Sequence, residues 1–222
     1  MSCFDRIKCN TSEMWLKERK KGIGGSDAAC ILGLNPWKTN QQLWREKVGL
    51  EEAEDISDKP AVIYGHKAEG SLRQLFRIDF PEYKLNYRNN EILRNKALPW
   101  LQASVDGELE EIDTGRKGIL EIKTTSILQS MQKEKWNHRV PDTYYLQCLH
   151  YLLATGYDFV VLKAQLKFDY PEMIKLETRH YKFNRSEVEE DMRILLAAEI
   201  EFQKQIKEHK EPALILPPVF RN

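Results

Sequence analysis

The sequence lacks an excess of either charge, because its 34 lysine and arginine residues equal its 34 aspartate and glutamate residues. Net charge therefore gives no indication of a polyanionic partner, and it excludes the class of uniformly basic proteins. A long hydrophobic run is also missing, since no apolar stretch approaches the length of a membrane span. Residues 1–10 carry no apolar segment that could act as a secretory signal. We therefore expect a cytoplasmic protein with no membrane association.

Cysteine and histidine are scarce and do not form metal-binding patterns. The four cysteines lack the paired C-x-x-C spacing of a zinc site, and nothing indicates a secreted context that favours disulfides. We predict free thiols at these positions. The five histidines show no pairing typical of a metal triad. The residues concerned are Cys3, Cys9, Cys30, Cys148, His66, His138, His150, His180 and His209.

What is present is the composition of an ordinary globular protein, with 41% hydrophobic and 31% charged residues among 222. This length suits a single domain spanning residues 1–222. The mixture of elements predicts an α/β (α+β) fold with an antiparallel hairpin within residues 101–124. Apolar periodicity predicts helices at 15–21, 26–32, 39–48, 63–78, 143–154 and 186–208, and strands at 83–93, 101–110, 118–124, 159–168 and 174–183.

Charged side chains gather on this predicted hairpin. Asp106 lies on its first strand, and Glu121 and Lys123 lie on its second. Side chains alternate along a strand, so Glu121 and Lys123 share one face while Leu120 and Ile122 occupy the other. The hairpin is therefore predicted to have a charged face backed by core.

The turn of the hairpin allows the register to be predicted. If Thr114 and Gly115 are a two-residue loop, counting outward places Asp106 opposite Lys123. Glu121 is then a diagonal neighbour of Asp106, roughly 7–8 Å away between backbones, which lets two carboxylates share one ion. A slip of one residue would separate them.

Two carboxylates and one amine are the groups that a metal-dependent phosphodiesterase requires. The carboxylates supply oxygen ligands for a hard cation, and the amine can orient an attacking water. A buried salt bridge would use the same side chains, and a Glu-x-Lys strand alone is a weak indication of chemistry. The hairpin by itself leaves both interpretations open.

Further motifs lie along most of the chain, and the first of them is long and specific. Together with the hairpin residues they are Gly22–Trp37, Tyr64–Glu69, Asp106, Glu121–Lys123, Tyr144, Gln147 and Tyr151. In order and spacing they resemble the YqaJ-like viral recombinase family, which is related to phage lambda exonuclease. The resemblance implies a restriction-endonuclease-like core, with a mixed central sheet and a catalytic hairpin flanked by helices.

The resemblance implies a role for each residue of a metal site. Asp106 and Glu121 would bind Mg²⁺, for which Mn²⁺ could substitute, and the backbone carbonyl of Ile122 would complete one coordination shell. Lys123 would orient or deprotonate the attacking water, because nearby divalent cations disfavour its charged form. Glu69 would sit near a second metal ion, directly or through water, unless it is an ordinary surface residue of its helix.

The resemblance also implies contacts to DNA. Gln147 would position the water or the scissile phosphate, and Tyr144 and Tyr151 share its helical stripe. The alternative is a polar stripe that faces solvent. Arg19 and Ser26 would hold a 5′-phosphate, although a serine at a helix start is more often an N-cap.

The resemblance implies a Mg²⁺-dependent 5′→3′ exonuclease that acts on linear double-stranded DNA. It would leave 3′ overhangs for a single-strand annealing protein, work as a homotrimer, and act in a bacterial host as a phage or prophage protein. One alternative is another nuclease on the same core, either an endonuclease or a RecB-like enzyme whose iron–sulfur cluster needs clustered cysteines. The other is a catalytically silent DNA-binding protein.

Overall fold

The computed structural model describes residues 2–127, 130–137, 139–170 and 172–216. The helices are α1 (Ser12–Arg19), α2 (Gly25–Ile31), α3 (Asn40–Lys47), α4 (Pro60–Asp79), α5 (Ser130–Glu134), α6 (Asp142–Thr155) and α7 (Glu189–Lys207). The strands are β1 (Phe4–Lys8), β2 (Tyr83–Asn86), β3 (Glu91–Asn95), β4 (Gln102–Ala103), β5 (Gly107–Glu111), β6 (Lys117–Ile127), β7 (Phe159–Tyr170) and β8 (Met173–Asn184). After β1 the helices α1 to α4 follow one another, then the strands β2 to β6, and the described part includes a short 3-10 helix at Arg185–Glu187.

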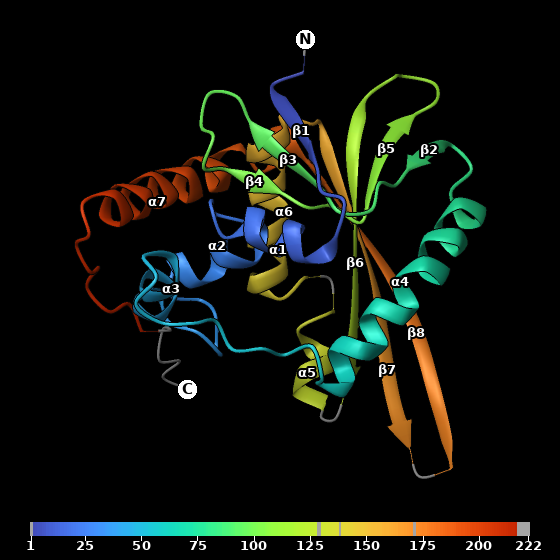
Figure 1. Cartoon of the computed structure of the whole chain (residues 1–222). Helices are drawn as coiled ribbons and strands as arrows, with labels where there is room; N and C mark the ends of the chain where they lie inside the picture. Colours follow the sequence, from blue (N-terminus) through green and yellow to red (C-terminus); the bar gives the residue numbers. More distant parts are fainter. Residues whose placement is uncertain (1, 128–129, 138, 171, 217–222) are drawn as a thin grey trace.

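A mixed five-stranded sheet forms the centre of the molecule, in the order β2-β5-β6-β7-β8 (Figure 1). Strands β6 and β7 are parallel and are connected through α5 and α6, whereas the other neighbouring strands are antiparallel. A smaller antiparallel sheet, β1-β3-β4, lies beside the first (Figure 1). The mixed sheet with an antiparallel hairpin confirms the predicted fold class.

Helix α4 covers one face of the main sheet because its apolar residues recur at helical spacing. Leu72 and Phe76 of this helix are buried against Leu120 and Ile122 of β6. As predicted, these two residues of β6 form the core side of the hairpin. Glu121 and Lys123 therefore point to the other face.

That other face packs against α6. Leu149 and Leu152 are fully buried there with Val160 and Leu162 of β7. Helix α7 packs against the outside of α6 through contacts that include Leu195. Because α6 is enclosed on several sides, its polar residues are also held in the interior. Among the described residues, no helix combines the length and hydropathy that crossing a membrane requires.

The predicted register of the hairpin is wrong by two residues. Gly107 pairs with Leu120, so the position before it, Asp106, lies beside Glu121 and not opposite Lys123. The loop is longer than two residues: Glu111 and Arg116 close it, and Gly115 adopts a left-handed φ of 71°. A shift of two residues preserves the face of each side chain, so Asp106 still shares the face of Glu121.

Two predicted strands are each divided between the two sheets. The stretch 83–93 contains β2 and the start of β3, and the stretch 101–110 contains β4 and most of β5. Residues 104–106 cross from the small sheet to the large one, and Asp106 is the last residue of that crossing. Strand β1 was not predicted, since Phe4 is its only buried residue.

Candidate active site

Asp106 is fixed at the start of β5 by two neighbouring elements. Its Oδ2 accepts a hydrogen bond of 2.7 Å from the backbone N–H of Ile122 on β6. Its backbone carbonyl accepts one of 3.0 Å from Nη1 of Arg73 on α4. These contacts hold the carboxyl group at the junction of the two sheets.

Glu121 lies at the centre of the site and is only 2% exposed. Its Oε1 is 2.6 Å from Nζ of Lys123 and accepts a hydrogen bond of 2.8 Å from Nε2 of Gln147. Its Oε2 is buried and has no hydrogen-bond partner within the described part of the chain. An unpartnered buried carboxylate oxygen is destabilising, and here it lies beside the carboxylate of Asp106, where a cation could bind to it.

The electrostatics of the site favour a cation. Burial raises the pKa of Glu121 to about 8 and also raises the pKa of Asp106, although Lys123 acts in the opposite direction in both cases. Burial lowers the pKa of Lys123, but the carboxylates of Glu121 and Asp106 outweigh this effect and raise it. Without another cation, Lys123 therefore remains an ammonium group that neutralises part of the acidic charge.

An oxygen-coordinated divalent cation fits these residues. Within the described residues, no three histidine, cysteine, aspartate or glutamate side chains form a ready-made metal cluster. Asp106 and Glu121 nevertheless supply two adjacent carboxylates, and the free Oε2 of Glu121 is a hard ligand of the kind that Mg²⁺ prefers. A bound cation would satisfy this atom and lower the pKa of both acids.

Glu69 and Arg73 extend the site from one face of α4. The side chain of Glu69 is 29% exposed, and burial followed by the charge of Asp106 raises its pKa. Glu69 is therefore partly buried and close enough to Asp106 to be affected by its charge. Sequence reasoning missed Arg73, which binds the carbonyl of Asp106 and stacks over the ring of Tyr87 at 3.6 Å. Its spacing of four residues from Glu69 was the available signal.

The stripe of α6 faces the acids and not the solvent. Gln147 donates to Glu121 and also to the hydroxyl of Tyr151, at 2.7 Å. The ring of Tyr144 lies 5.3 Å from Nζ of Lys123. Gln147 and Tyr151 are buried because α2 packs against them. The three predicted residues therefore line one side of the site.

Arg19 and Ser26 lie together at the start of α2, where Arg19 Nη2 donates to Ser26 Oγ at 3.4 Å. The interpretation of Ser26 as an N-cap is wrong. Gly24 is the N-cap, and its N–H donates to the Asp27 carboxylate at 3.0 Å. Asp27 thereby satisfies the helix start, and the hydroxyl of Ser26 is left for Arg19 or a ligand.

Gly25 brings this pair next to the stripe of α6. A Cβ atom at Gly25 would lie 2.7 Å from Tyr151 and 2.8 Å from Gln147. Only glycine allows the two helices to approach this closely, because any other residue would overlap both side chains. The structure thus brings together the predicted residues Arg19, Ser26, Gln147 and Tyr151.

Comparison with known proteins identifies the family and the fold of this chain. The sequence pattern of the YqaJ-like viral recombinase domain matches residues 14–158. This chain belongs to that family. It is 37% identical, over 176 residues, to the uncharacterized protein YqaJ of Bacillus subtilis (strain 168). The match covers 75% of this chain but 52% of that protein, so the chain spans about half the length of the curated relative.

The fold of this YqaJ-like chain is also that of solved exonucleases. The alkaline exonuclease LHK-Exo from Laribacter hongkongensis superposes with a TM-score of 0.62 at 17% identity, covering 90% of this chain and 96% of that one. A phage-related exonuclease from Haemophilus somnus 129PT gives a TM-score of 0.56 at 14% identity, covering 85% and 96%. At these identities the likeness establishes the restriction-endonuclease-like fold alone.

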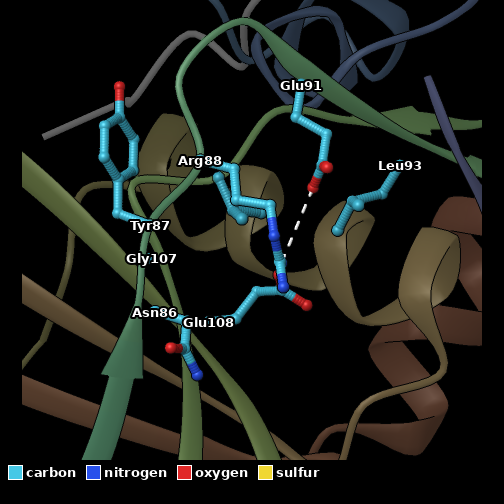
Figure 2. A pocket seen from close by; sticks show the side chains of 8 residues that line it. Asn86, Tyr87, Arg88, Glu91, Leu93, Gly107 and Glu108 are labelled. Carbon is cyan, nitrogen blue, oxygen red and sulfur yellow. Dashed lines mark hydrogen bonds and ion pairs between the residues drawn. The ribbon is translucent and has the colours of Figure 1, made fainter. Parts of the chain in front are cut away.

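A small hollow behind the hairpin of the YqaJ-like chain has a structural role. Figure 2 shows Arg88 between Glu91 and Glu108, where its guanidinium lies 2.5 Å from Glu108. Arg6 of β1 pairs with the same Glu108 at 2.6 Å. The hollow is about 10 Å³, room for roughly one water molecule. These ion pairs join the small sheet to β5 and leave no space for a substrate.

Proposed function

We propose that this YqaJ-like chain is a metal-dependent deoxyribonuclease that degrades one strand of linear duplex DNA from its 5′ end. The observation that carries the proposal is the convergence of Asp106, Glu121 and Lys123 around the unpartnered Oε2 of Glu121. A buried ion pair can also leave one carboxylate oxygen open, as Glu199 does beside His150. What distinguishes Glu121 is that a second carboxylate, that of Asp106, lies beside its open oxygen and Lys123.

Each group of the site has a chemical role in this proposal. Asp106, Glu121 and the backbone carbonyl of Ile122 would hold Mg²⁺, or Mn²⁺ in its place, and Glu69 would serve a second ion. Such ions supply charge that stabilises the phosphorane transition state. Lys123 orients the attacking water, and it can accept its proton once the acids no longer stabilise the ammonium form. Gln147 fixes the orientation of the Glu121 carboxylate.

A 5′-phosphate site next to the catalytic acids would set the direction of degradation. Arg19 and Ser26 offer a guanidinium and a hydroxyl to a terminal phosphate, and Arg19 is held by stacking over Trp15 at 4.6 Å. Tyr151 lies between this pair and Glu121 and would contact the intervening nucleotide. LHK-Exo has also been solved in complex with dAMP, which shows that a protein of this fold binds a mononucleotide.

Membership of this family also supports proposals about the location, oligomeric state and origin of the enzyme and about its partner. We propose that the enzyme is a cytoplasmic homotrimer of phage or prophage origin. Its products would be 3′ single-stranded overhangs, which a partner annealing protein would use for recombination.

The direct test is incubation of the full chain with Mg²⁺ and three substrates: linear duplex with a 5′-phosphate, the same duplex with a 5′-hydroxyl, and a closed circle. The proposal predicts release of mononucleotides from the first, slower release from the second, and none from the circle. Cutting of the circle would favour an endonuclease. No cutting of any substrate would favour a silent DNA-binding protein.

The polarity pocket has its own test. Arg19→Ala should reduce the ratio of rates on 5′-phosphate and 5′-hydroxyl ends by roughly tenfold or more, since a charge-assisted contact is lost. Lys17→Ala removes the same charge from an exposed position of the same helix and is the control. An unchanged ratio in the Arg19 variant would remove this residue from phosphate recognition.

A further inference from the structure

A cavity of about 430 Å³ is lined by Tyr144, whose ring centroid lies 5.3 Å from Nζ of Lys123. Its walls come from the loop after α2, the end of β6, the segment around α5, and the first turn of α6. The proposed roles of Asp106, Glu121 and Lys123 do not involve this cavity. Its volume is typical of a site for one small molecule or one nucleotide unit.

Two aromatic rings form a fixed wall of this cavity. Trp136 and Tyr144 are 5.5 Å apart between ring centroids and are inclined by 30°. The backbone carbonyl of Trp136 accepts hydrogen bonds from Arg179 at 2.6 Å and from the hydroxyl of Tyr181 at 2.5 Å, both on β8. The wall is therefore held in place before any ligand binds.

A third aromatic residue stands at the rim. Trp37 lines the cavity while remaining 78% exposed, which is unusual for a side chain of its size. Its backbone N–H and that of Lys38 both donate to Asn35 Oδ1, at 2.8 Å and 3.1 Å. The loop is thus ordered, and it presents a ring whose surface is available for stacking.

The charge at the rim suits a phosphodiester strand. Lys135 and Arg139 line the cavity, and neither forms an ion pair with another residue of the described chain. One carboxylate, Asp142, also lines it. Two cations against one acid leave a net positive rim around apolar rings, which is the combination that binds unpaired nucleotides.

The cavity continues the path of the strand through the active site. Along α6, Tyr151 lies against Gly25, next to Ser26, Gln147 binds Glu121, and Tyr144 lies near Lys123 and lines the cavity. These positions span seven residues, or roughly 10 Å of helix. A strand whose terminal phosphate is held at Arg19 therefore passes the acids first and reaches the cavity next.

We propose that this cavity receives the base of the second nucleotide, on the 3′ side of the scissile phosphate. The inference rests on the proposed function and specifies how that site holds its substrate. Stacking between Trp37 and Tyr144 accepts any base, since every base has a π-face, and Trp136, which is 3% exposed, supports the Tyr144 ring from behind. Removal of the second base from its duplex neighbour aligns the phosphate between the first and second nucleotides with Glu121.

The test combines DNA substrates that lack one base with an enzyme variant that lacks one aromatic ring. Single-turnover release of the first nucleotide is measured, over a range of enzyme concentrations, on 5′-phosphorylated duplexes that are intact, abasic at position 2, or abasic at position 6. The enzymes are wild type, Trp37→Ala, and the control Leu50→Ala, whose side chain is 69% exposed and lines neither hollow.

With wild type, the abasic site at position 2 should raise the half-saturating enzyme concentration roughly 5- to 100-fold, and the one at position 6 should change it little. Trp37→Ala should show a comparable increase on intact DNA and little further increase with the position 2 substrate. Leu50→Ala should behave as wild type. Equal effects of positions 2 and 6, or independent effects of Trp37→Ala and the abasic site, would overturn the proposal.

A binding measurement keeps this inference separate from catalysis. The probe is a 5′-phosphorylated trinucleotide with 2-aminopurine at its second position, mixed with the Asp106→Asn variant in Ca²⁺. Stacking in the cavity should quench the probe, and an added Trp37→Ala change should restore much of its fluorescence. Binding detected by anisotropy without quenching would contradict the proposal even if the enzyme cleaves DNA. Quenching by a chain that cleaves nothing would support the pocket and refute the function.

Discussion

The carboxyl group of Glu121 has one oxygen with two partners and one oxygen with none in the described structure. A buried polar atom without a partner destabilises the native state, and local departures of this kind occur at functional sites. Glu199 also has an open buried oxygen, but no second carboxylate is found beside it in the described structure. The open oxygen of Glu121 next to Asp106 and Lys123 is therefore the informative combination.

A second buried pair allows a prediction about pH. His150 and Glu199 are both fully buried, with His150 Nδ1 at 2.6 Å from Glu199 and Nε2 at 2.8 Å from the carbonyl of Gln102. Burial lowers the pKa of His150, but the Glu199 carboxylate outweighs it and the pKa is raised above 6.5. The contribution of this ion pair to the free energy of unfolding is fully present below pH 6.5, and it is lost as the pH rises through the raised pKa of His150.

The free energy of unfolding should therefore decline as pH rises above 6.5, measured by urea denaturation. Glu199→Gln should cost about 2 kcal/mol at pH 6 and progressively less at higher pH, since the charge-assisted hydrogen bond is already weakened there. Glu201→Gln, on an exposed position of the same helix, is the control. A constant cost of Glu199→Gln from pH 6 to 9 would show that His150 does not titrate in this range.

At the scale of residues, the sequence predicted the strand face on which a side chain lies better than it predicted the residues that the side chain contacts. Alternation along β6 placed Glu121 and Lys123 together correctly, and this result survived an error of two residues in the register. The alternative of Ser26 as an N-cap is wrong because the Asp27 side chain, three residues after the N-cap Gly24, satisfies the helix start. Arg73 was missed because its contact with Asp106 joins elements that are distant in sequence.

At the scale of elements, the close contact of α2 with α6 places the Arg19–Ser26 pair beside the acids. Gly25→Ala introduces a methyl group 2.7 Å from Tyr151 and 2.8 Å from Gln147, so the helices must separate. We expect a loss of about 1–3 kcal/mol in stability and a loss of preference for 5′-phosphorylated ends. Thermal unfolding and end-specific rates measure the two effects.

Gly70→Ala is the matched control for this change. A Cβ atom at Gly70, inside α4, meets nothing within 4 Å. Alanine favours the helix by up to about 1 kcal/mol, so this variant should be slightly stabilised and retain its end preference. If Gly25→Ala behaves in the same way, the close approach of α2 and α6 is needed neither for stability nor for the preference for 5′-phosphorylated ends.

The elements with strong periodicity were predictable, and those that depend on distant contacts were not. Helix α4 was found because Leu72 and Phe76 recur at helical spacing over a long segment. The small sheet was missed because β4 has two residues and β1 buries only Phe4. The hairpin loop was misjudged because its length depends on the Thr114 side chain, which accepts from Arg116 N–H and donates to Glu111.

At the scale of the whole molecule, self-association is the main prediction. Ile174 and Leu176 lie on the same side of β8, an edge strand of the described sheet, and are 57% and 49% exposed. Exposed apolar residues on a sheet edge offer a surface for another chain. Light scattering at working concentrations should give the mass of three chains. A monomer over the whole concentration range would contradict the trimer without affecting the site.

The most direct test of the central claim is the rate of mononucleotide release from 5′-phosphorylated linear duplex, measured for wild type and Asp106→Asn across a Mg²⁺ titration. The account predicts Mg²⁺-dependent release by wild type. It also predicts a loss of at least about a thousandfold in Asp106→Asn, with DNA binding retained, because one of two metal-binding carboxylates is gone. Asp113→Asn, an exposed residue of the hairpin loop, should retain the wild-type rate. A wild-type rate in Asp106→Asn, or release that needs no divalent ion, would contradict the account.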